Sequence, residues 1–239
     1  HAVMSADECL RCAAILPACG FERSVLEALY SSFEDRNDEI HVTDLVHCLR
    51  KSFLDKRNPP IEPPHLMVNK MFGIAVHEYL SGKNGDSGEI AVEVEGVKAR
   101  VDYYKDGILV DYKTTRAIYP DLIPYGEHEM QLRLYAWMLE RSGRKVNRCY
   151  LVYIANGGPT ECKKCRRPHE YCDGEIVCSQ CGGTTKSASI GIKTVEIEKD
   201  NFAAERMFRD RKIALESAMK SGALPQAEPS WLCKYCKHE

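Results

Sequence analysis

Twelve cysteines in a chain of 239 residues constrain this fold more than any other feature of the sequence. Most of them fall into Cys-x-x-Cys pairs, at Cys9/Cys12, Cys162/Cys165, Cys178/Cys181 and Cys233/Cys236. Small secreted domains stapled by disulfides are much shorter, whereas paired spacing of this kind is typical of metal ligation in a reducing compartment. We therefore expect a cytoplasmic metalloprotein.

The remaining composition is that of a globular chain. Apolar residues make up 44% and charged residues 28%, which argues against disorder. No apolar run approaches the roughly 18 residues of a transmembrane helix, so no membrane partner is expected. Lys plus Arg (33) nearly balance Asp plus Glu (35), and a formal charge of −2 excludes a strongly basic nucleic-acid wrapper. A local basic groove is still allowed.

Helical and strand periods alternate along the chain, which predicts an α/β fold. Five helices are expected, over 21–33, 44–56 with Thr43 as N-cap, 65–80 closed by Gly82 and Gly85, 128–142 and 201–220. Five strands are expected, over 89–95, 97–104, 108–113, 149–155 and 189–198. Gly96 and Asp106-Gly107 are the turn signals between the first three strands.

One segment, 157–186, differs in kind from the rest. It is rich in Gly, Cys, Lys and Arg and poor in large apolar residues, which indicates an insertion between two strands of one sheet. The other expected divisions are an N-terminal helical region with a cluster cysteine, a core, and a last strand and helix with a cysteine-bearing tail, at 5–64, 65–156 and 187–239.

The insertion has the ligands of a structural zinc ribbon, at Cys162, Cys165, Cys178 and Cys181. Four thiolates in two knuckles give a closed tetrahedral site, and a segment without a core needs a metal in its place. Cys172 is left over once four positions are filled. The basic residues between 163 and 167 either contact DNA phosphate or a partner, or only solvate the knuckle.

Two carboxylates and a lysine gather at the ends of adjacent predicted strands. Asp111 and Lys113 are two residues apart and share a face, and Asp102 lies on the strand before the Asp106-Gly107 turn. Burying such a cluster without a partner is costly, and Mg²⁺ or Mn²⁺ would offset the cost. Ordinary ion pairs on a strand surface are the alternative.

The surroundings of this cluster favour the metal site over the alternative. Gln131 and Tyr135 are four residues apart and share a helix face just after the strands. His77 lies on the preceding predicted helix, where it could complete the metal shell.

Several motifs then occur in the order and approximate spacing of the RecB-like branch of the PD-(D/E)XK nucleases, which the sequence resembles. They are Gly73-Ile-Ala-Val-His77, Gly96…Asp102, Ile108-Leu-Val-Asp111-Tyr-Lys113-Thr114 and Gln131-Leu-Arg-Leu-Tyr135. The resemblance covers most of 41–155 and the C-terminal tail. It implies a restriction-endonuclease-like core, a mixed central sheet flanked by helices.

The same resemblance implies a role for each matching residue. The Mg²⁺ or Mn²⁺ ligands would be His77, Asp102, Asp111 and the Tyr112 carbonyl. Lys113 would be the catalytic lysine, and Gln131 and Tyr135 would steady the active site and the DNA backbone. Arg116 and Arg133 are further candidates for DNA contact.

One cysteine before this core and a pair after it resemble the iron–sulfur nucleases, and among them the CRISPR-associated exonucleases of the Cas four family. The resemblance implies an iron–sulfur staple, four-iron rather than two-iron, that joins the two ends of the chain through Cys48, Cys233 and Cys236. The fourth ligand stays open, and the candidates are Cys19, Cys9, Cys12 and His238. Zinc at this site is an alternative.

By resemblance, the chain is a metal-dependent exonuclease that trims single-stranded DNA ends in CRISPR spacer acquisition. The implied partners are DNA, CRISPR adaptation proteins and a second copy of the chain. A RecB-like repair nuclease working with a helicase is one alternative. A non-catalytic module that binds DNA ends or a partner protein is another, although the complete Asp–Asp–Lys set argues against it.

Overall fold

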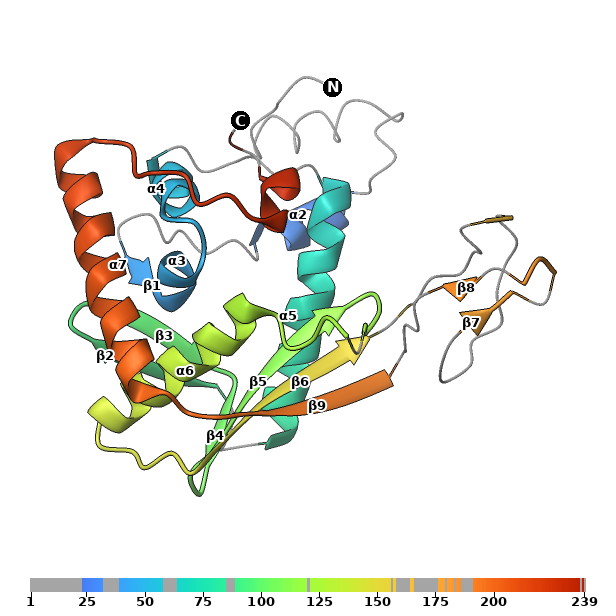
Figure 1. Ribbon diagram of the computed structural model, residues 1–239, viewed down its shortest axis with the longest axis horizontal. Helices are drawn as coiled ribbons and strands as arrows, with labels where there is room; N and C mark the ends of the chain where they lie inside the picture. Colours follow the sequence, from blue (N-terminus) through green and yellow to red (C-terminus); the bar gives the residue numbers. More distant parts are fainter. Residues whose placement is uncertain are drawn as a thin grey trace. The chain divides into compact units, whose positions relative to one another are not determined.

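The computed structural model divides the chain into two compact units, His1–Val76 with Phe208–Glu239, and His77–Met207 (Figure 1). The residues that it describes are 23–31, 39–57, 64–84, 89–119, 121–155, 157, 164–165, 176–178, 180–182, 184–185, 191–236 and 238. Among the described helices, none has both the length and the apolar character needed to cross a bilayer.

A mixed four-stranded sheet forms the centre of the second unit (Figure 1). Its strands, in spatial order, are β4 (Tyr103–Lys105), β5 (Ile108–Thr115), β6 (Arg148–Ala155) and β9 (Gly191–Ile197). β5 and β6 run parallel, while β4 and β9 pair antiparallel with their neighbours. The predicted α/β class with a mixed sheet is confirmed.

Two tight hairpins lead into this sheet. The first joins β2 (Ile90–Val94) to β3 (Val97–Val101), and the second joins β4 to β5. Both central residues of each turn have positive φ, 50° and 79° at Glu95-Gly96 and 50° and 80° at Asp106-Gly107. Such turns match the twist of the flanking strands, so the turn signals in the sequence were interpreted correctly.

The single strand predicted over 97–104 is wrong, because the chain breaks at Asp102 between β3 and β4. At this break the Asp102 carboxylate accepts a hydrogen bond from the backbone amide of Tyr112 at 2.7 Å. A side chain thus takes the donor that strand pairing would otherwise satisfy. The break leaves a buried carboxylate between the two strands.

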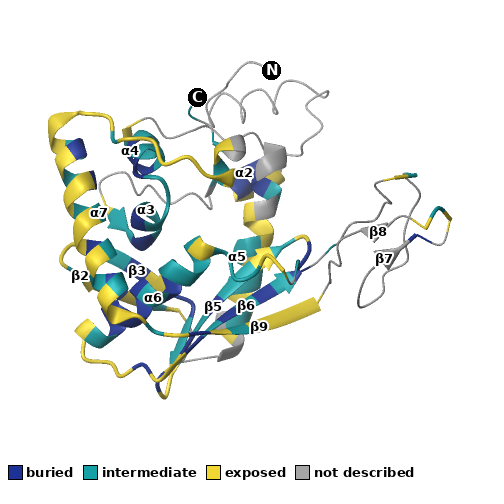
Figure 2. Cartoon of the chain, in the orientation of Figure 1, coloured by how far each residue is buried: buried dark blue, intermediate teal, exposed yellow. Residues whose placement is uncertain are grey.

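Helix α6 (Gly126–Arg141) contacts β5, β6 and β9 of the sheet, and also β2 and β3. Much of its inward side is buried, with Leu132 and Leu139 fully so, and it covers the buried side of β6 (Figure 2). This burial holds the helix over β5, which carries Asp111, and over the parallel strand β6 beside it.

The first unit contains three short helices, α2 (Arg23–Ser31), α3 (Val42–Val46) and α4 (Leu49–Arg57). The single helix predicted over 44–56 is wrong, because extended backbone at His47 separates α3 from α4. Thr43 is not its cap either. His41 occupies that position, and its amide donates to Asp44 Oδ2 at 2.8 Å.

Two long helices, α5 (Pro64–Asn84) and α7 (Asn201–Ser221), and the short 3₁₀ helix η2 (Trp231–Tyr235) complete the elements with helical backbone. The helix end was predicted at Gly82 and Gly85. Gly85 lies outside the described residues, and α5 is not ended by Gly82. This glycine stays helical and does not take the left-handed conformation of a helix terminus, so α5 continues past it.

Within the first unit, the segment around residues 45–49 is hydrogen-bonded to residues 211 and 228 of the C-terminal part. Arg211 of α7 donates to the carbonyls of Leu45 and His47 and pairs with Glu228 at 2.7 Å. The Leu49 amide also donates to Glu228, at 3.4 Å. The backbone on both sides of position 48 is therefore tied to the C-terminal segment.

The predicted insertion does connect neighbouring strands of one sheet, because β6 and β9 pair antiparallel from Cys149↔Ile197 to Ala155↔Gly191. Within the insertion, β7 (Ile176–Val177) pairs with β8 (Thr184–Thr185). Most of 157–186, including Cys162 and Cys172, lies outside the described residues.

Candidate active site

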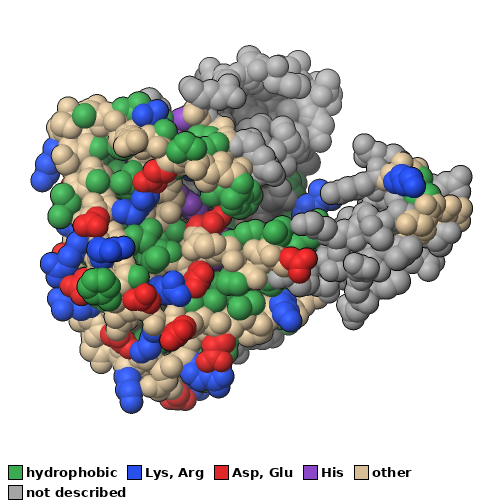
Figure 3. Space-filling model, in the orientation of Figure 1, with side chains coloured by type: hydrophobic (Ala, Val, Ile, Leu, Met, Phe, Trp, Pro, Cys, Tyr) green, Lys and Arg blue, Asp and Glu red, His purple; other side chains and the backbone are tan. Residues whose placement is uncertain are grey.

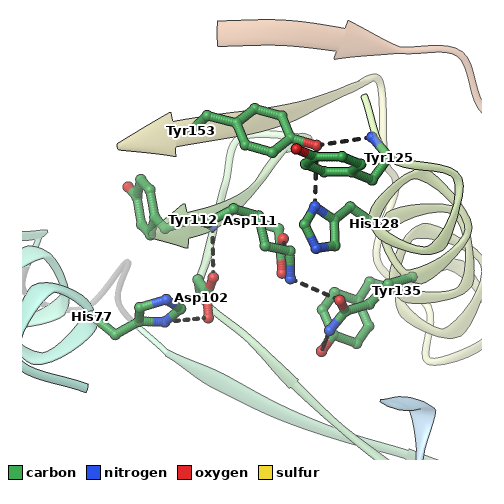
Figure 4. A network of polar contacts seen from close by, with 10 residues as sticks. His77, Asp102, Asp111, Tyr112, Tyr125, His128, Tyr135 and Tyr153 are labelled. Atoms are coloured by element: carbon green, nitrogen blue, oxygen red, sulfur yellow. Dashed lines mark hydrogen bonds and ion pairs between the residues drawn. The ribbon is translucent and has the colours of Figure 1, made fainter. Parts of the chain in front are cut away.

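The site begins where α5 meets the break at Asp102. His77 Nδ1 lies 3.0 Å from Asp102 Oδ1, and the other carboxylate oxygen accepts the amide of Tyr112 (Figure 4). The His77 ring also stands edge-on to the Tyr112 ring. Both oxygens of a carboxylate that is only 7% exposed are thus engaged, which holds Asp102 in one orientation.

Asp111 lies on β5 and is almost completely buried. Lys113 Nζ approaches its Oδ2 at 2.8 Å, but that oxygen accepts no hydrogen bond of good geometry. Extending the β4–β5 register from Tyr103↔Val110 by one step sets Asp102 opposite Asp111. The Asp106-Gly107 turn in the sequence predicts this proximity of the two carboxylates.

The ammonium of Lys113 is shared between the sheet and α6. It donates to Gln131 Oε1 at 2.7 Å, and Gln131 Nε2 donates in turn to the Tyr135 hydroxyl at 2.7 Å. Because these two residues are four apart, they lie on the same side of the helix. Gln131 and Tyr135 therefore fix the position of the lysine beside Asp111.

Burial dominates the electrostatics of the site. It raises the pKa of Asp111 from 3.8 to about 6, against the opposing pull of Lys113. Burial also raises the pKa of Tyr135, which therefore stays a neutral phenol. The hydrogen bond to Asp102 raises the pKa of His77, and burial only partly opposes it. A carboxylate with so high a pKa is poorly stabilised by the protein alone.

The donor set fits a hard divalent cation. Two buried carboxylates supply oxygen ligands, and Asp111 Oδ2 has an unfilled acceptor direction. In the described part of the chain, however, the ligand atoms of His77, Asp102 and Asp111 are not all within 4.8 Å of one another. As arranged, His77 supports Asp102 as a hydrogen-bond partner.

Three residues that the sequence analysis missed lie next to this site. His128 Nδ1 and the Tyr125 amide both contact the Tyr153 hydroxyl, at 3.1 and 3.2 Å (Figure 4). A signal was available, since His128 precedes Gln131 by three residues and Tyr153 pairs with Lys113 across β5 and β6.

The two arginines singled out for DNA contact occupy different settings. Arg133 pairs with Glu129 at 2.7 Å and donates to the Glu198 carbonyl at 3.1 Å. Two residues from Gln131, it lies on another side of α6. Arg116 is exposed just after β5, near the end of the strand that carries Lys113. DNA contact by either residue stays a prediction.

A second group of ligand atoms lies in the insertion. The sulfur atoms of Cys165, Cys178 and Cys181 are all within 4.8 Å of one another, and the first two are 3.6 Å apart. The backbone amide of Gln180 lowers the pKa of the Cys178 thiol, which favours the thiolate that binds metals. The fourth predicted ligand, Cys162, lies outside the described residues.

The proposed cluster cysteines belong to the first unit. Cys48 lies between α3 and α4, and Cys233 and Cys236 lie in and just after η2. None of these three cysteines forms a disulfide. His238, a candidate fourth ligand, instead holds Asp55 Oδ1 through Nε2 at 2.6 Å. The other candidates, Cys9, Cys12 and Cys19, are outside the described residues.

Comparison with known proteins identifies the family. The model of the PD-(D/E)XK nuclease superfamily matches residues 24–239, so the chain belongs to this superfamily. No curated protein sequence matches it. A crystal structure of SSO0001 shares the fold at a TM-score of 0.50, with 21% identity over 90% of each chain.

Two further solved structures are more distant. One is a putative exonuclease from Eubacterium rectale, with 13% identity over 87% of this chain and 91% of that one, at a TM-score of 0.48. The other is a phage related exonuclease from Haemophilus somnus 129PT, with 14% identity over 92% and 93%, at a TM-score of 0.41. Neither likeness is strong enough to carry an argument about this chain.

Proposed function

We propose that this chain is a divalent-metal-dependent deoxyribonuclease that hydrolyses phosphodiester bonds. One observation carries the proposal. The carboxylate of Asp111 is buried beside the second carboxylate of Asp102, and its Oδ2 has only the Lys113 ammonium, 2.8 Å away without good hydrogen-bond geometry, as a partner. A structural role would favour an apolar or fully hydrogen-bonded residue here, because such burial is costly.

Each residue of the site then has a chemical role. Asp102 and Asp111 would hold Mg²⁺ or Mn²⁺, with the Tyr112 carbonyl and His77 as the further ligands taken from the family resemblance. The bound cation supplies positive charge next to the phosphate. Lys113 offers a second positive charge, and Gln131 and Tyr135 hold its ammonium where negative charge develops.

The finer part of the proposal concerns substrate and context. The order of the motifs supports an exonuclease on single-stranded DNA ends, acting with CRISPR adaptation proteins in spacer acquisition. The formal charge of −2 supports local rather than global attraction of DNA. On the face in Figure 3, acidic and basic side chains are interspersed.

The test is cleavage of a labelled single-stranded oligonucleotide with Mn²⁺ or Mg²⁺, compared with a chelator. Lys113→Ala should lose on the order of 10³-fold in rate while still folding, because it removes the charge that stabilises the transition state. Lys105→Ala, an exposed lysine on β4, is the matched control and should cleave like the wild type.

Wild-type rates in Lys113→Ala would refute the mechanism. Binding of DNA ends without any metal-stimulated cleavage would favour the non-catalytic module instead. A circular single strand of the same sequence distinguishes the exonuclease, which needs an end, from an endonuclease.

We also propose zinc at Cys165, Cys178 and Cys181, with Cys162 as fourth ligand. On a tetrahedral Zn²⁺ with bonds of about 2.3 Å, two thiolates lie roughly 3.8 Å apart, close to the 3.6 Å between Cys165 and Cys178. Zinc analysis of the purified protein should give one equivalent that is lost in Cys178→Ser.

An iron–sulfur cluster at Cys48, Cys233 and Cys236 is the third proposed cofactor, four-iron by family resemblance. It is supported by free thiols in one unit, where Arg211 and Glu228 tie the backbone around Cys48 to the C-terminal segment. Anaerobically purified protein should be brown and contain iron and sulfide. Colourless protein with a second equivalent of zinc would favour the zinc alternative.

A further inference from the structure

The side of α6 that faces the sheet carries a third polar residue before Gln131 and Tyr135. His128, Gln131 and Tyr135 follow one another at intervals of three and four residues, so all three lie on one side of the helix. His128 stands in the first turn, and its Nδ1 contacts the Tyr153 hydroxyl of β6 at 3.1 Å (Figure 4).

Tyr153 also fixes the position at which α6 begins. The amide of Tyr125, the N-cap residue, donates to the Tyr153 hydroxyl at 3.2 Å, and no side chain caps this end. The Tyr125 ring stands edge-on to His128 and Tyr153, with centroids 5.4 and 6.2 Å away. Two hydrogen bonds and these ring contacts therefore anchor the helix start to β6.

The Tyr153 hydroxyl is chemically suited to both contacts. The hydroxyl oxygen accepts from the Tyr125 amide, and the phenol hydrogen is available to His128 Nδ1 in the tautomer that leaves Nδ1 without a hydrogen. Burial raises the pKa of Tyr153 to about 12, which keeps that hydrogen in place. The side chain is 1% exposed, so water does not compete for either bond.

These contacts close a ring with the catalytic lysine. Tyr153 and Lys113 are register partners on the parallel strands β6 and β5, so they stand side by side. On the sheet, Lys113 is linked to Tyr153 by strand pairing, and the Tyr153 hydroxyl contacts His128 of α6. One turn along the helix, Gln131 accepts a hydrogen bond from Lys113 at 2.7 Å, which completes the ring. A helix held at one point can still rotate, whereas two cross-links fix it.

We propose that Tyr153 and His128 are positioning residues of the active site, which set α6 so that Gln131 holds the Lys113 ammonium beside Asp111. Neither residue needs to touch the reacting atoms. The inference rests on the proposed nuclease function, and it assigns these residues to the turnover step rather than to DNA binding.

Tyr153→Phe removes the hydroxyl and keeps the ring. We expect kcat to fall about 10-fold with KM for a single-stranded oligonucleotide nearly unchanged, since a small misplacement of a catalytic group has effects of this order. Tyr150→Phe is the matched control. It lies on the other side of β6, where its ring is stacked with Arg148, and it should behave like the wild type.

Substitution of His128 separates positioning from general packing. Asn places an amide near the Nδ1 position and can still accept from the phenol, whereas Leu cannot. His128→Asn should therefore keep most of the activity, and His128→Leu should match Tyr153→Phe. The double variant Tyr153→Phe/His128→Leu should be no worse than either single change.

The outcomes decide the two proposals separately. If the wild type fails to cleave with Mn²⁺, the proposed function fails. If it cleaves and Lys113→Ala does not, but Tyr153→Phe keeps the wild-type kcat, only the positioning role is wrong. The positioning role would also be wrong if kcat fell as much in Tyr150→Phe as in Tyr153→Phe, or if His128→Asn and His128→Leu lost activity equally.

A measurement without activity completes the test. A crystal structure of Tyr153→Phe should show the Gln131–Lys113 contact lengthened from 2.7 Å to beyond hydrogen-bonding distance, about 3.5 Å. An unchanged contact would contradict the proposal. If Tyr153→Phe does not fold, His128→Leu at a partly exposed helix position serves in its place.

Discussion

The acidic site and the cysteine group of the insertion both lie in the second unit, yet different forces hold their ligands. Asp111 and Lys113 are fixed by a strand that pairs on both sides, and α6 holds Lys113 through Gln131. Cys165, Cys178 and Cys181 come from short segments whose regular structure is one pair of two-residue strands in the described part of the insertion.

The comparison shows that the fold of the sheet holds the acidic site in place, whereas the cysteine group needs its metal to hold the insertion together. A sheet can hold carboxylates in an unfavourable place, because packing elsewhere offsets the cost. A segment without a core can hold thiolates together only if the metal supplies the free energy. Removing a ligand should therefore have opposite effects on stability in the two regions.

Removal of zinc should have the largest effect. Structural zinc sites contribute about 10–16 kcal/mol of apparent binding free energy, so chelation should unfold the insertion locally. Limited proteolysis with mass spectrometry should find new cuts within 157–190, while amides of β5, β6 and α6 keep their protection from hydrogen exchange. Cys178→Ser should reproduce the cuts. If the insertion resists the protease equally with and without zinc, its fold does not depend on the metal, and the proposed difference from the sheet site is wrong.

Substitution in the hairpin turn before β5 should show how closely the residues at this end of the sheet are packed. Gly107 has φ of +80°, and an added Cβ would lie 2.3 Å from Asn147 Nδ2 and 3.2 Å from the Lys145 carbonyl. Gly107→Ala should cost about 3 kcal/mol in denaturant unfolding. Gly96→Ala is the control with the same φ strain and open space, and it should cost about 1 kcal/mol. Equal costs would mean that the Asn147 contact relaxes freely.

Asp111→Asn should stabilise the metal-free protein, by about 2 kcal/mol near pH 7.5. Between pH 3.8 and about 6, the folded protein keeps a proton at Asp111 that the unfolded chain releases. Stability of the wild type should therefore fall as pH rises through this range and stay low above it. Urea unfolding at pH 4.5 and 7.5 with chelator present measures both effects.

Asp106→Asn, at an exposed turn position that already has positive φ, controls for the loss of a charge. It should change neither the free energy of unfolding at pH 7.5 nor its dependence on pH. A destabilised Asp111→Asn would show that the sheet site, like the cysteine group, depends on its own ligands for folding.

Cys149 should give the smallest response, because it is a cysteine of the sheet rather than of the insertion. It is 2% exposed, and burial raises its pKa to about 11. At pH 8 only about one thiol in a thousand would be ionised, so iodoacetamide should leave it unmodified in the native protein. Chelation should expose Cys165 and its partners to the reagent without exposing Cys149, and mass spectrometry distinguishes the two. Alkylation of Cys149 before unfolding would contradict a rigid β6.

Local spacing explains which parts of the acidic site the sequence could predict. A strand repeats every two residues, so Asp111 and Lys113 had to share a side, and a helix repeat brings Gln131 to the side of Tyr135. The turn at Asp106-Gly107 set the two carboxylates opposite each other, because its geometry fixes the register. None of these inferences needed a contact between distant segments.

The errors arose where distant partners override local preference. Residues 97–104 read as one strand, yet the Tyr112 amide draws the Asp102 carboxylate into a break. Residues 44–56 read as one helix, yet the carbonyl of His47, at the interruption, bonds to Arg211 from the other end of the chain. Both partners lie too far along the sequence for a local pattern to reveal them.

By itself, the sequence determined the α/β class, the shared sides of Asp111 with Lys113 and of Gln131 with Tyr135, and the Cys-x-x-Cys spacing, because these depend on side-chain type and on repeats of two to four residues. Only the tertiary structure decided that Asp111 keeps an oxygen without a hydrogen bond, that Lys113 is held by Gln131, and that the Tyr153 hydroxyl anchors α6. Those features depend on how a helix and a sheet pack, and packing joins residues that the sequence separates.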